Sequence, residues 1–247
     1  MMGSIRITGL GKRFMLGCER KQKALGALFQ IISGIEAKKE FFSLTDISVD
    51  VREGAHVGVI GKNGSGKSTL LKLMAGIYSP TQGQVIVSGP VLFASELVAA
   101  FGSRLTVRDH IYLFGSSFRL KRSLIVQLMD EILDFAGLQE FSETRIYQLS
   151  QGMKERLALS MILTAIDHSD AKTILLDEVF RGGFDTSFRE KTLERLRDLM
   201  GSEKTFIFIS HNLGFIKEFC QQVVWLEDGR VKKIGGKDLV AEYSRAR

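Results

Sequence analysis

An α/β fold is predicted for this chain because apolar, strand-like runs alternate with helical segments along its 247 residues. Residues 173–176 and 205–209 are continuous apolar runs, as expected for strands that are buried on both faces of a parallel sheet. A charged amphipathic helix is predicted between them, over residues 190–200. This alternation favours a parallel sheet whose strands are joined by helices.

The N-terminal part is predicted to contain short strands around an insertion. Strands are expected over residues 5–8 and 44–51, on either side of a basic insertion at residues 17–40. Within the insertion, residues 24–32 have the pattern of a short amphipathic helix. A solvated loop is slightly favoured over a helix that faces a partner or a membrane, and both interpretations stay open. A further strand is predicted over residues 85–87.

The middle of the chain, from residue 97 to about residue 165, has a helical pattern. An apolar stripe at helical spacing supports this prediction, and it consists of Leu124, Ile125, Leu128, Met129, Ile132, Leu133 and Phe135. Near the C-terminus, residues 223–226 and 230–231 are predicted to form a hairpin with a turn at Asp228 and Gly229.

Composition excludes several classes of protein. A chain of this length buries enough surface to fold without disulfides, and Cys18 and Cys220 suit a reducing compartment. We find neither a secretory signal nor an apolar run long enough to cross a membrane. The net charge of +6 permits anionic partners, but no basic run interleaved with aromatic residues indicates a nucleic-acid platform, and we expect no nucleic-acid partner.

The clearest motif is a glycine-rich loop that follows a predicted strand at residues 55–60 and precedes a predicted helix at residues 69–75. It matches the pattern G-x-x-x-x-G-K-[ST] with Gly61, Lys62, Asn63, Gly64, Ser65, Gly66, Lys67 and Ser68. Glycines let backbone N–H groups approach phosphate oxygens, and a helix N-terminus favours an anion. The Lys67 ammonium can reach the β- and γ-phosphates, and the Ser68 hydroxyl can ligate Mg²⁺.

Polar residues follow the two apolar strands. Asp177 and Glu178 come directly after the first, where Asp177 can hold Mg²⁺ and Glu178 can orient or deprotonate an attacking water. His211 follows the second strand and can donate a hydrogen bond to a γ-phosphate oxygen, although a lone histidine is usually structural. Ser150 and Gly152 precede another apolar helix, where they form either a second anion site or a simple helix cap.

These motifs, in this order, resemble the ATP-binding subunit of an ABC transporter over nearly the whole chain. The resemblance implies a P-loop NTPase (RecA-like) core with an antiparallel β N-terminal portion and an inserted helical subdomain. It implies a single ABC ATPase domain over residues 1–247, in which residues 1–96 and 166–247 form the nucleotide-binding core and residues 97–165 the helical subdomain. ATP and Mg²⁺ are the implied ligands.

The resemblance also assigns roles to residues. Glu178, His211 and Lys67 would be catalytic, and Ser68, Asp177 and Glu96 would hold the metal. ATP would contact residues Phe14, Gly61, Lys62, Asn63, Gly64, Ser65, Gly66, Lys67, Ser68, Thr69, Glu96, Ser150 and Gly152. In this family two subunits pack head to tail, so Ser150 and Gly152 would contact the ATP of a second copy. Phe14 would stack on adenine, and the alternative for this residue is a core aromatic.

Residues 95–101, 105–113 and 152–158 are similar to the corresponding segments of polysaccharide exporters in this family. That similarity implies an ATPase on the cytoplasmic face of the inner (plasma) membrane, bound peripherally to integral-membrane permease subunits that export O-antigen, capsule or teichoic acid. One alternative is a non-transport ABC ATPase that acts on nucleic acid. Another is a regulatory ABC module with weak hydrolysis.

Three departures from the family pattern bear on these roles. Glu96 stands where the family usually has glutamine, and Gln151 stands where it has a small residue. The segment from Glu178 to Asp185 is one residue longer than usual, so the inter-subunit role that the family gives to this aspartate is a hypothesis for Asp185.

Overall fold

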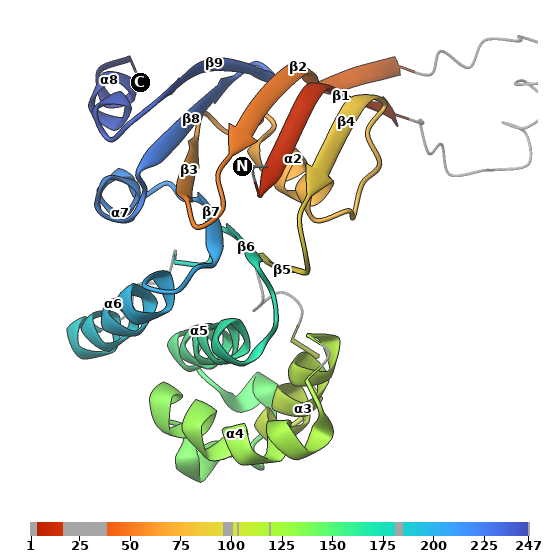
Figure 1. Cartoon of the computed structure of the whole chain (residues 1–247). Helices are drawn as coiled ribbons and strands as arrows, with labels where there is room; N and C mark the ends of the chain where they lie inside the picture. The colour runs from red at the N-terminus through yellow and green to blue at the C-terminus, as the bar shows by residue number, and fades with distance from the viewer. Residues whose placement is uncertain are drawn as a thin grey trace, which may run out of the picture.

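The structure is a computed structural model that describes residues 4–16, 39–95, 101–102, 104–118, 120–180 and 185–246. Figure 1 shows two sheets in the upper part of the molecule and a group of helices below them. A three-stranded sheet has the order β2-β1-β4, and a six-stranded sheet has the order β5-β6-β7-β3-β8-β9.

The strands are β1 (Ile5–Leu16), β2 (Lys39–Val51), β3 (His56–Ile60), β4 (Gln82–Val87), β5 (Val91–Ser95), β6 (Thr173–Asp177), β7 (Thr205–Ile209), β8 (Gln222–Glu227) and β9 (Arg230–Gly235). The helices are α2 (Lys67–Met74), α3 (Val107–Ser117), α4 (Arg122–Ala136), α5 (Gln151–His168), α6 (Thr186–Met200), α7 (Leu213–Phe219) and α8 (Asp238–Ala246). Two short 3₁₀ turns cover Gln139–Phe141 and Ile146–Gln148.

The larger sheet places three buried strands side by side at its centre. Every residue of β3, β6 and β7 is buried, as their continuous apolar sequences predict. These strands run parallel, and the register pairs Asp177 with Ile209 and Val59 with Ile209. The loops that follow the three strands therefore emerge at the same edge of the sheet.

The smaller sheet is antiparallel, and its strands are longer than predicted. Strand β1 continues to Leu16 and β2 begins at Lys39, so the two strands enclose the basic insertion. The amphipathic helix expected at residues 24–32 lies outside the described residues. Strand β5 and helices α7 and α8 lacked a sequence prediction, and α6 begins at Thr186 instead of residue 190.

Helices α3, α4 and α5 pack around an apolar cluster of their own. The predicted stripe of α4 faces this cluster, and its buried members are Ile125, Leu128, Met129, Ile132 and Leu133. The α/β fold with an antiparallel portion and a helical insertion is thereby confirmed. The boundaries at residues 97 and 165 stay a prediction.

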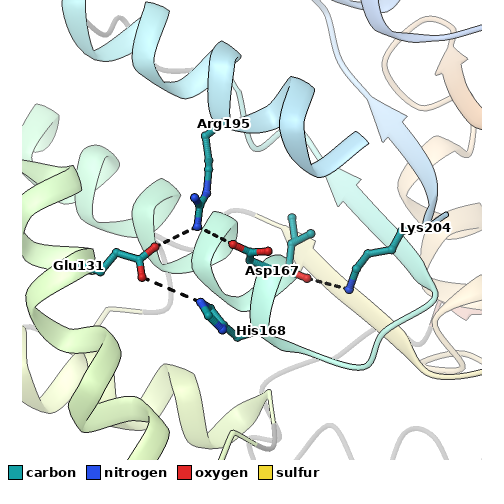
Figure 2. Close-up of polar contacts among 6 residues, drawn as sticks. Glu131, Asp167, His168, Arg195 and Lys204 are labelled. Carbon is teal, nitrogen blue, oxygen red and sulfur yellow. Dashed lines mark hydrogen bonds and ion pairs between the residues drawn. The ribbon is translucent and has the colours of Figure 1, made fainter. Parts of the chain in front are cut away.

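An arginine connects the helical group to the core (Figure 2). Arg195 of α6 places Nη2 3.0 Å from Glu131 Oε1 of α4 and 2.6 Å from Asp167 Oδ2 of α5. His168 Nε2 lies 4.0 Å from the other Glu131 oxygen. Each side chain is partly exposed, so water screens these pairs, and their main effect is to fix how the three helices meet.

The Lys204 side chain caps the C-terminal end of α5. Its Nζ donates to the carbonyl oxygens of Ile166 at 2.9 Å, Ser169 at 2.9 Å and Ala171 at 3.1 Å, and Figure 2 shows it reaching the end of this helix. Partial burial lowers the pKa of Lys204. A cation at this position satisfies helix-terminal carbonyls that have no intrahelical donor.

In the part of the chain that the structure describes, no helix combines the length and the apolar character needed to cross a bilayer.

Changing Lys204 to Met should lower the free energy of unfolding by about 1–3 kcal/mol, because three carbonyl oxygens lose a charged donor. Urea unfolding followed by circular dichroism measures this loss. Lys217→Met on the exposed side of α7 is the matched control. If the two variants had the same free energy of unfolding, water would replace the Lys204 ammonium at these carbonyl oxygens without loss of stability.

Candidate nucleotide-binding site

The glycine-rich loop runs from the end of β3 to the start of α2 at the centre of the larger sheet. A Cβ on Gly61 would lie 2.3 Å from the Leu226 carbonyl oxygen, and the backbone here has φ of 153°. A Cβ on Gly66 would lie 2.5 Å from Leu44 Cδ2, at φ of 98°. Only glycine fits at these two positions, and the loop is therefore wedged between β8 and β2.

Lys67 lies along the inside of this loop. Its Nζ donates to the carbonyl oxygens of Gly61 and Lys62, at 2.9 Å in both cases. The side chain is buried, and it lines the cleft above the loop. The predicted phosphate-binding ammonium is thus held in place by the loop itself.

Glu178 and His211 meet across the ends of β6 and β7. Glu178 Oε1 lies 3.1 Å from His211 Nε2, and the carboxylate is buried while the imidazole is about one-third exposed. The Glu178 backbone N–H donates to the Ile209 carbonyl oxygen at 3.0 Å, and its φ of 57° is in the left-handed region. The structure therefore brings together two residues that the sequence placed on separate strands.

A cleft of about 440 Å³ joins these groups. Its lining consists of Phe41, Ser43, Asn63, Gly64, Gly66, Lys67, Ser68, Thr69, Glu178, Ile209 and His211. The loop residues at its floor suit a polyphosphate, because glycines, a helix N-terminus and an ammonium face the same space. Ser65 is buried under the loop, and its Oγ has no hydrogen-bond partner among the described residues.

Some predicted site residues lie elsewhere. Asp177 is buried at the end of β6 but is not part of the cleft lining. Phe14 also lies outside that lining, and its ring packs edge-on against Tyr78 with centroids 5.4 Å apart. Glu96 lies outside the described residues. The Ser68 hydroxyl and the Asp177 carboxylate would offer oxygen atoms, the ligand type that a hard cation such as Mg²⁺ prefers.

Ser150 and Gly152 are far along the chain from the cleft and do not line it. Ser150 caps α5, where its Oγ accepts from the Met153 backbone N–H at 3.3 Å. Both residues are exposed, and a Cβ built at Gly152 would meet no described atom within 4 Å. Within one chain, this segment presents a helix N-terminus to solvent.

Gln151, which departs from the family pattern, and Asp185, which ends the longer segment, both have local partners. Gln151 Nε2 donates to Glu155 Oε1 at 2.9 Å, one turn along α5. Asp185 caps α6 through the Phe188 backbone N–H at 2.9 Å, and its other oxygen lies 3.8 Å from Arg156 Nη1. These contacts give Gln151 and Asp185 structural roles in the single chain.

Sequence reasoning missed Phe41, which lines the cleft from β2. The predicted strand began at residue 44, so the aromatic pair Phe41 and Phe42 was left outside it. The signal was present, because two adjacent aromatic residues are typical of a strand.

The profile of the ABC transporter family matches residues 44–181. The chain belongs to this family. It is 35% identical over 219 residues to the O-antigen export system ATP-binding protein RfbB of Klebsiella pneumoniae, covering 88% of this chain and 85% of that protein. It is 31% identical over 246 residues to the teichoic acids export ATP-binding protein TagH of Staphylococcus haemolyticus, covering 99% of this chain and 89% of that protein.

Solved ABC cassettes share the fold. A dimeric cassette in a post-hydrolysis state with ADP and phosphate superposes with a TM-score of 0.72 at 20% identity, covering 94% of this chain and 98% of that one. The ATP-binding subunit of another ABC transporter gives a TM-score of 0.73, also at 20% identity, covering 97% and 93%. ABC ATPases bind nucleotide, and ATPase activity is expected of this chain as a member of the family.

Changing Lys67 to Ala should weaken ATP binding at least tenfold, because the cleft loses its buried ammonium. Isothermal titration calorimetry with ATP measures the change. Lys72→Ala is the matched control, since this residue lies on the same helix and faces Tyr78 instead of the cleft. Unchanged affinity of the Lys67 variant would contradict the assignment of the phosphate site.

Proposed function

We propose that this chain is the ATP-binding and ATP-hydrolysing subunit of an ABC transporter that powers export of a polysaccharide or a glycolipid-linked polymer. ATP hydrolysis is supported above all by the fact that Lys67, Glu178 and His211 line the same cleft. The export part is supported by relatives that are named for O-antigen and teichoic acid export.

Hydrolysis would proceed by attack of water on the γ-phosphorus of ATP, while the bond from this phosphorus to the β–γ bridging oxygen breaks and ADP leaves. Glu178 accepts the proton of this water, and His211 holds the Glu178 carboxylate from 3.1 Å away. Lys67 stabilises charge on the phosphate oxygens. Ser68 and Asp177 would hold Mg²⁺, which supplies further charge neutralisation when it is bound. Glu96 stays a predicted ligand for the metal and the nucleotide.

The nucleotide site would be completed by a second copy of the chain. Ser150 and Gly152 are exposed at the start of α5 and are absent from the cleft lining of their own chain, which supports contact with a partner's ATP. The dimeric cassettes among the structural neighbours support the same arrangement. Closure of two subunits over two ATP molecules would bury the phosphates, and loss of the γ-phosphate would release the dimer.

The motion would be passed to integral-membrane permease subunits, with this chain bound peripherally on the cytoplasmic face of the inner (plasma) membrane. The relatives do not support the alternatives of a nucleic-acid ATPase or a weakly hydrolysing regulatory module. A steady-state ATPase assay distinguishes these functions, because stimulation by nucleic acid or a rate near background would contradict the proposal.

Changing Glu178 to Gln should leave ATP affinity intact and lower turnover at least a hundredfold, because the general base is lost. The uncleaved nucleotide should then hold two chains together, and light scattering after size-exclusion chromatography measures this dimer. Glu203→Gln is the control, since Glu203 is exposed before β7. Normal turnover in the Glu178 variant would remove Glu178 from its assigned role.

Mixing two inactive variants tests the composite site. Lys67→Ala and Gly152→Asp should each be inactive alone, but a mixture should regain ATPase activity. In a mixed dimer, the intact loop of the Gly152 variant meets the intact Ser150–Gly152 segment of the Lys67 variant. If all these residues served one site within a single chain, the mixture would be as inactive as its components.

A further inference from the structure

Asn63 and Gly64 occupy an open turn in the phosphate loop. The Ser65 backbone N–H donates to the Lys62 carbonyl oxygen at 3.2 Å, which makes Asn63 and Gly64 the two central residues of the turn. Both are exposed, and both line the cleft. Gly64 has φ of 79°, and a Cβ built on it would meet no atom of the described residues within 4 Å. Water therefore has free access to the junction between the two residues.

The described part of the chain holds neither reacting group of this Asn-Gly pair. Among the described residues, the Asn63 side-chain amide makes no hydrogen bond, and the Gly64 backbone N–H has no acceptor. The next N–H along the loop, that of Ser65, is already engaged by the turn. The Asn63 amide can thus rotate toward the Gly64 nitrogen without breaking a contact.

An asparagine in this position can lose its amide to the nitrogen of the following residue. Hydroxide removes the proton of the Gly64 N–H, and the nitrogen attacks Asn63 Cγ to form a succinimide ring. The Cγ–Nδ2 bond breaks, and the amide nitrogen takes a proton from water and leaves as ammonia. Water then opens the ring at either carbonyl carbon, which gives aspartate or, with the backbone passing through Cγ, isoaspartate. One water is consumed for each ammonia released, and nothing is oxidised or reduced.

The chain contains one other asparagine, Asn212, and it provides an internal comparison. Asn212 is exposed like Asn63, but it is followed by Leu213, whose side chain hinders attack by its nitrogen. Asn212 Oδ1 accepts from the Phe215 backbone N–H at 3.1 Å, so the amide is held as the cap of α7. The two asparagines therefore match in exposure and differ in the two features that govern the reaction.

Deamidation of Asn63 would change the charge of the phosphate site. Asn63 lines the same cleft as Lys67, and a carboxylate there would repel the phosphates that the loop is suited to hold. Isoaspartate would also lengthen the backbone of a loop that is wedged between two strands at Gly61 and Gly66. A bound nucleotide would restrain the loop in its reactant form, so the reaction would occur mainly in the nucleotide-free chain.

We propose that Asn63 and Gly64 form a modification site, where the nucleotide-free loop deamidates spontaneously to aspartate or isoaspartate and loses affinity for ATP, while bound nucleotide slows the reaction. The loss of affinity and the protection rest on the proposed function, because they require ATP in the cleft. A chain kept without nucleotide would thus be inactivated at its own phosphate loop.

The test follows both asparagines of the full chain by mass spectrometry of its peptides. The chain is incubated at mildly alkaline pH with and without AMP-PNP, an ATP analogue that resists hydrolysis, and isoaspartate is identified by enzymatic methylation. Asn63 should convert about tenfold faster than Asn212, which is held as a helix cap. AMP-PNP at about ten times its Kd should slow the conversion of Asn63 about tenfold. Asn63→Gln should abolish the conversion at this position, because glutamine closes the corresponding larger ring far more slowly.

Isothermal titration calorimetry with AMP-PNP tests the consequence for binding. Asn63→Asp should bind AMP-PNP about tenfold more weakly than Asn63→Gln, because only aspartate adds a negative charge to the cleft. The incubated chain should lose binding-competent sites in proportion to the fraction of Asn63 converted.

Conversion of Asn63 no faster than that of Asn212 would overturn the proposal. Protection would be refuted if AMP-PNP bound to the chain without slowing the conversion, and the loss of affinity would be refuted if Asn63→Asp bound AMP-PNP as tightly as Asn63→Gln. If the unmodified chain did not bind AMP-PNP, the proposed function itself would fail, whereas rapid conversion of Asn63 would still establish the modification site.

Discussion

The rest of the site depends on one constraint, which is the close approach of the glycine backbone of the phosphate loop to the neighbouring strands β8 and β2. The loop passes between the Leu226 carbonyl oxygen and the β2 backbone at Ser43, and a Cβ on Gly61 or Gly66 would overlap them. The two sheets can therefore meet at the loop instead of lying apart. This junction lets β2 contribute to a cleft whose other wall carries Glu178 and His211. A larger residue at either glycine would push β2 and its part of the cleft lining away from Glu178 and His211.

Glu178 occupies a second constrained position. Its φ of 57° is unusual for a residue with a side chain, and such a conformation costs about 1–3 kcal/mol. A hydrogen bond to the sheet offsets part of this cost, because the Ile209 carbonyl oxygen accepts from the Glu178 backbone N–H. The result is a sharp change of direction after β6 that aims the carboxylate at His211. Strain at this point serves the geometry of the carboxylate, not the stability of the sheet.

Sequence patterns predicted the parts of the fold that depend on local chemistry. Strands β3, β6 and β7 are buried on both faces, so their apolar composition was sufficient, and the glycine loop between β3 and α2 has a fixed motif. Burial did not reveal the full length of β1 and β2, because Phe41 and Phe42 are exposed and owe their conformation to pairing with β1; the only local signal there was the adjacent aromatic pair. The contact between Glu178 and His211 likewise depends on the order of strands in the sheet, which spacing along the chain does not reveal.

Helix α5 connects the exposed Ser150 segment to β6, the strand that precedes Glu178 of the same chain. It has 18 residues, and at 1.5 Å per residue it is about 27 Å long. Its N-terminal half is linked to the start of α6 through Arg156 and Asp185, which lie 3.8 Å apart. Its C-terminal end is held by Lys204, shortly before β6 leads to Glu178. Under the proposed dimer, a partner's nucleotide would contact Ser150 at the start of a helix that is linked through Arg156 and Lys204 to segments on either side of Glu178 in the sequence. In that dimer, coupling between the two sites would act through α5, the ion pair between Arg156 and Asp185, and the hydrogen bonds of Lys204.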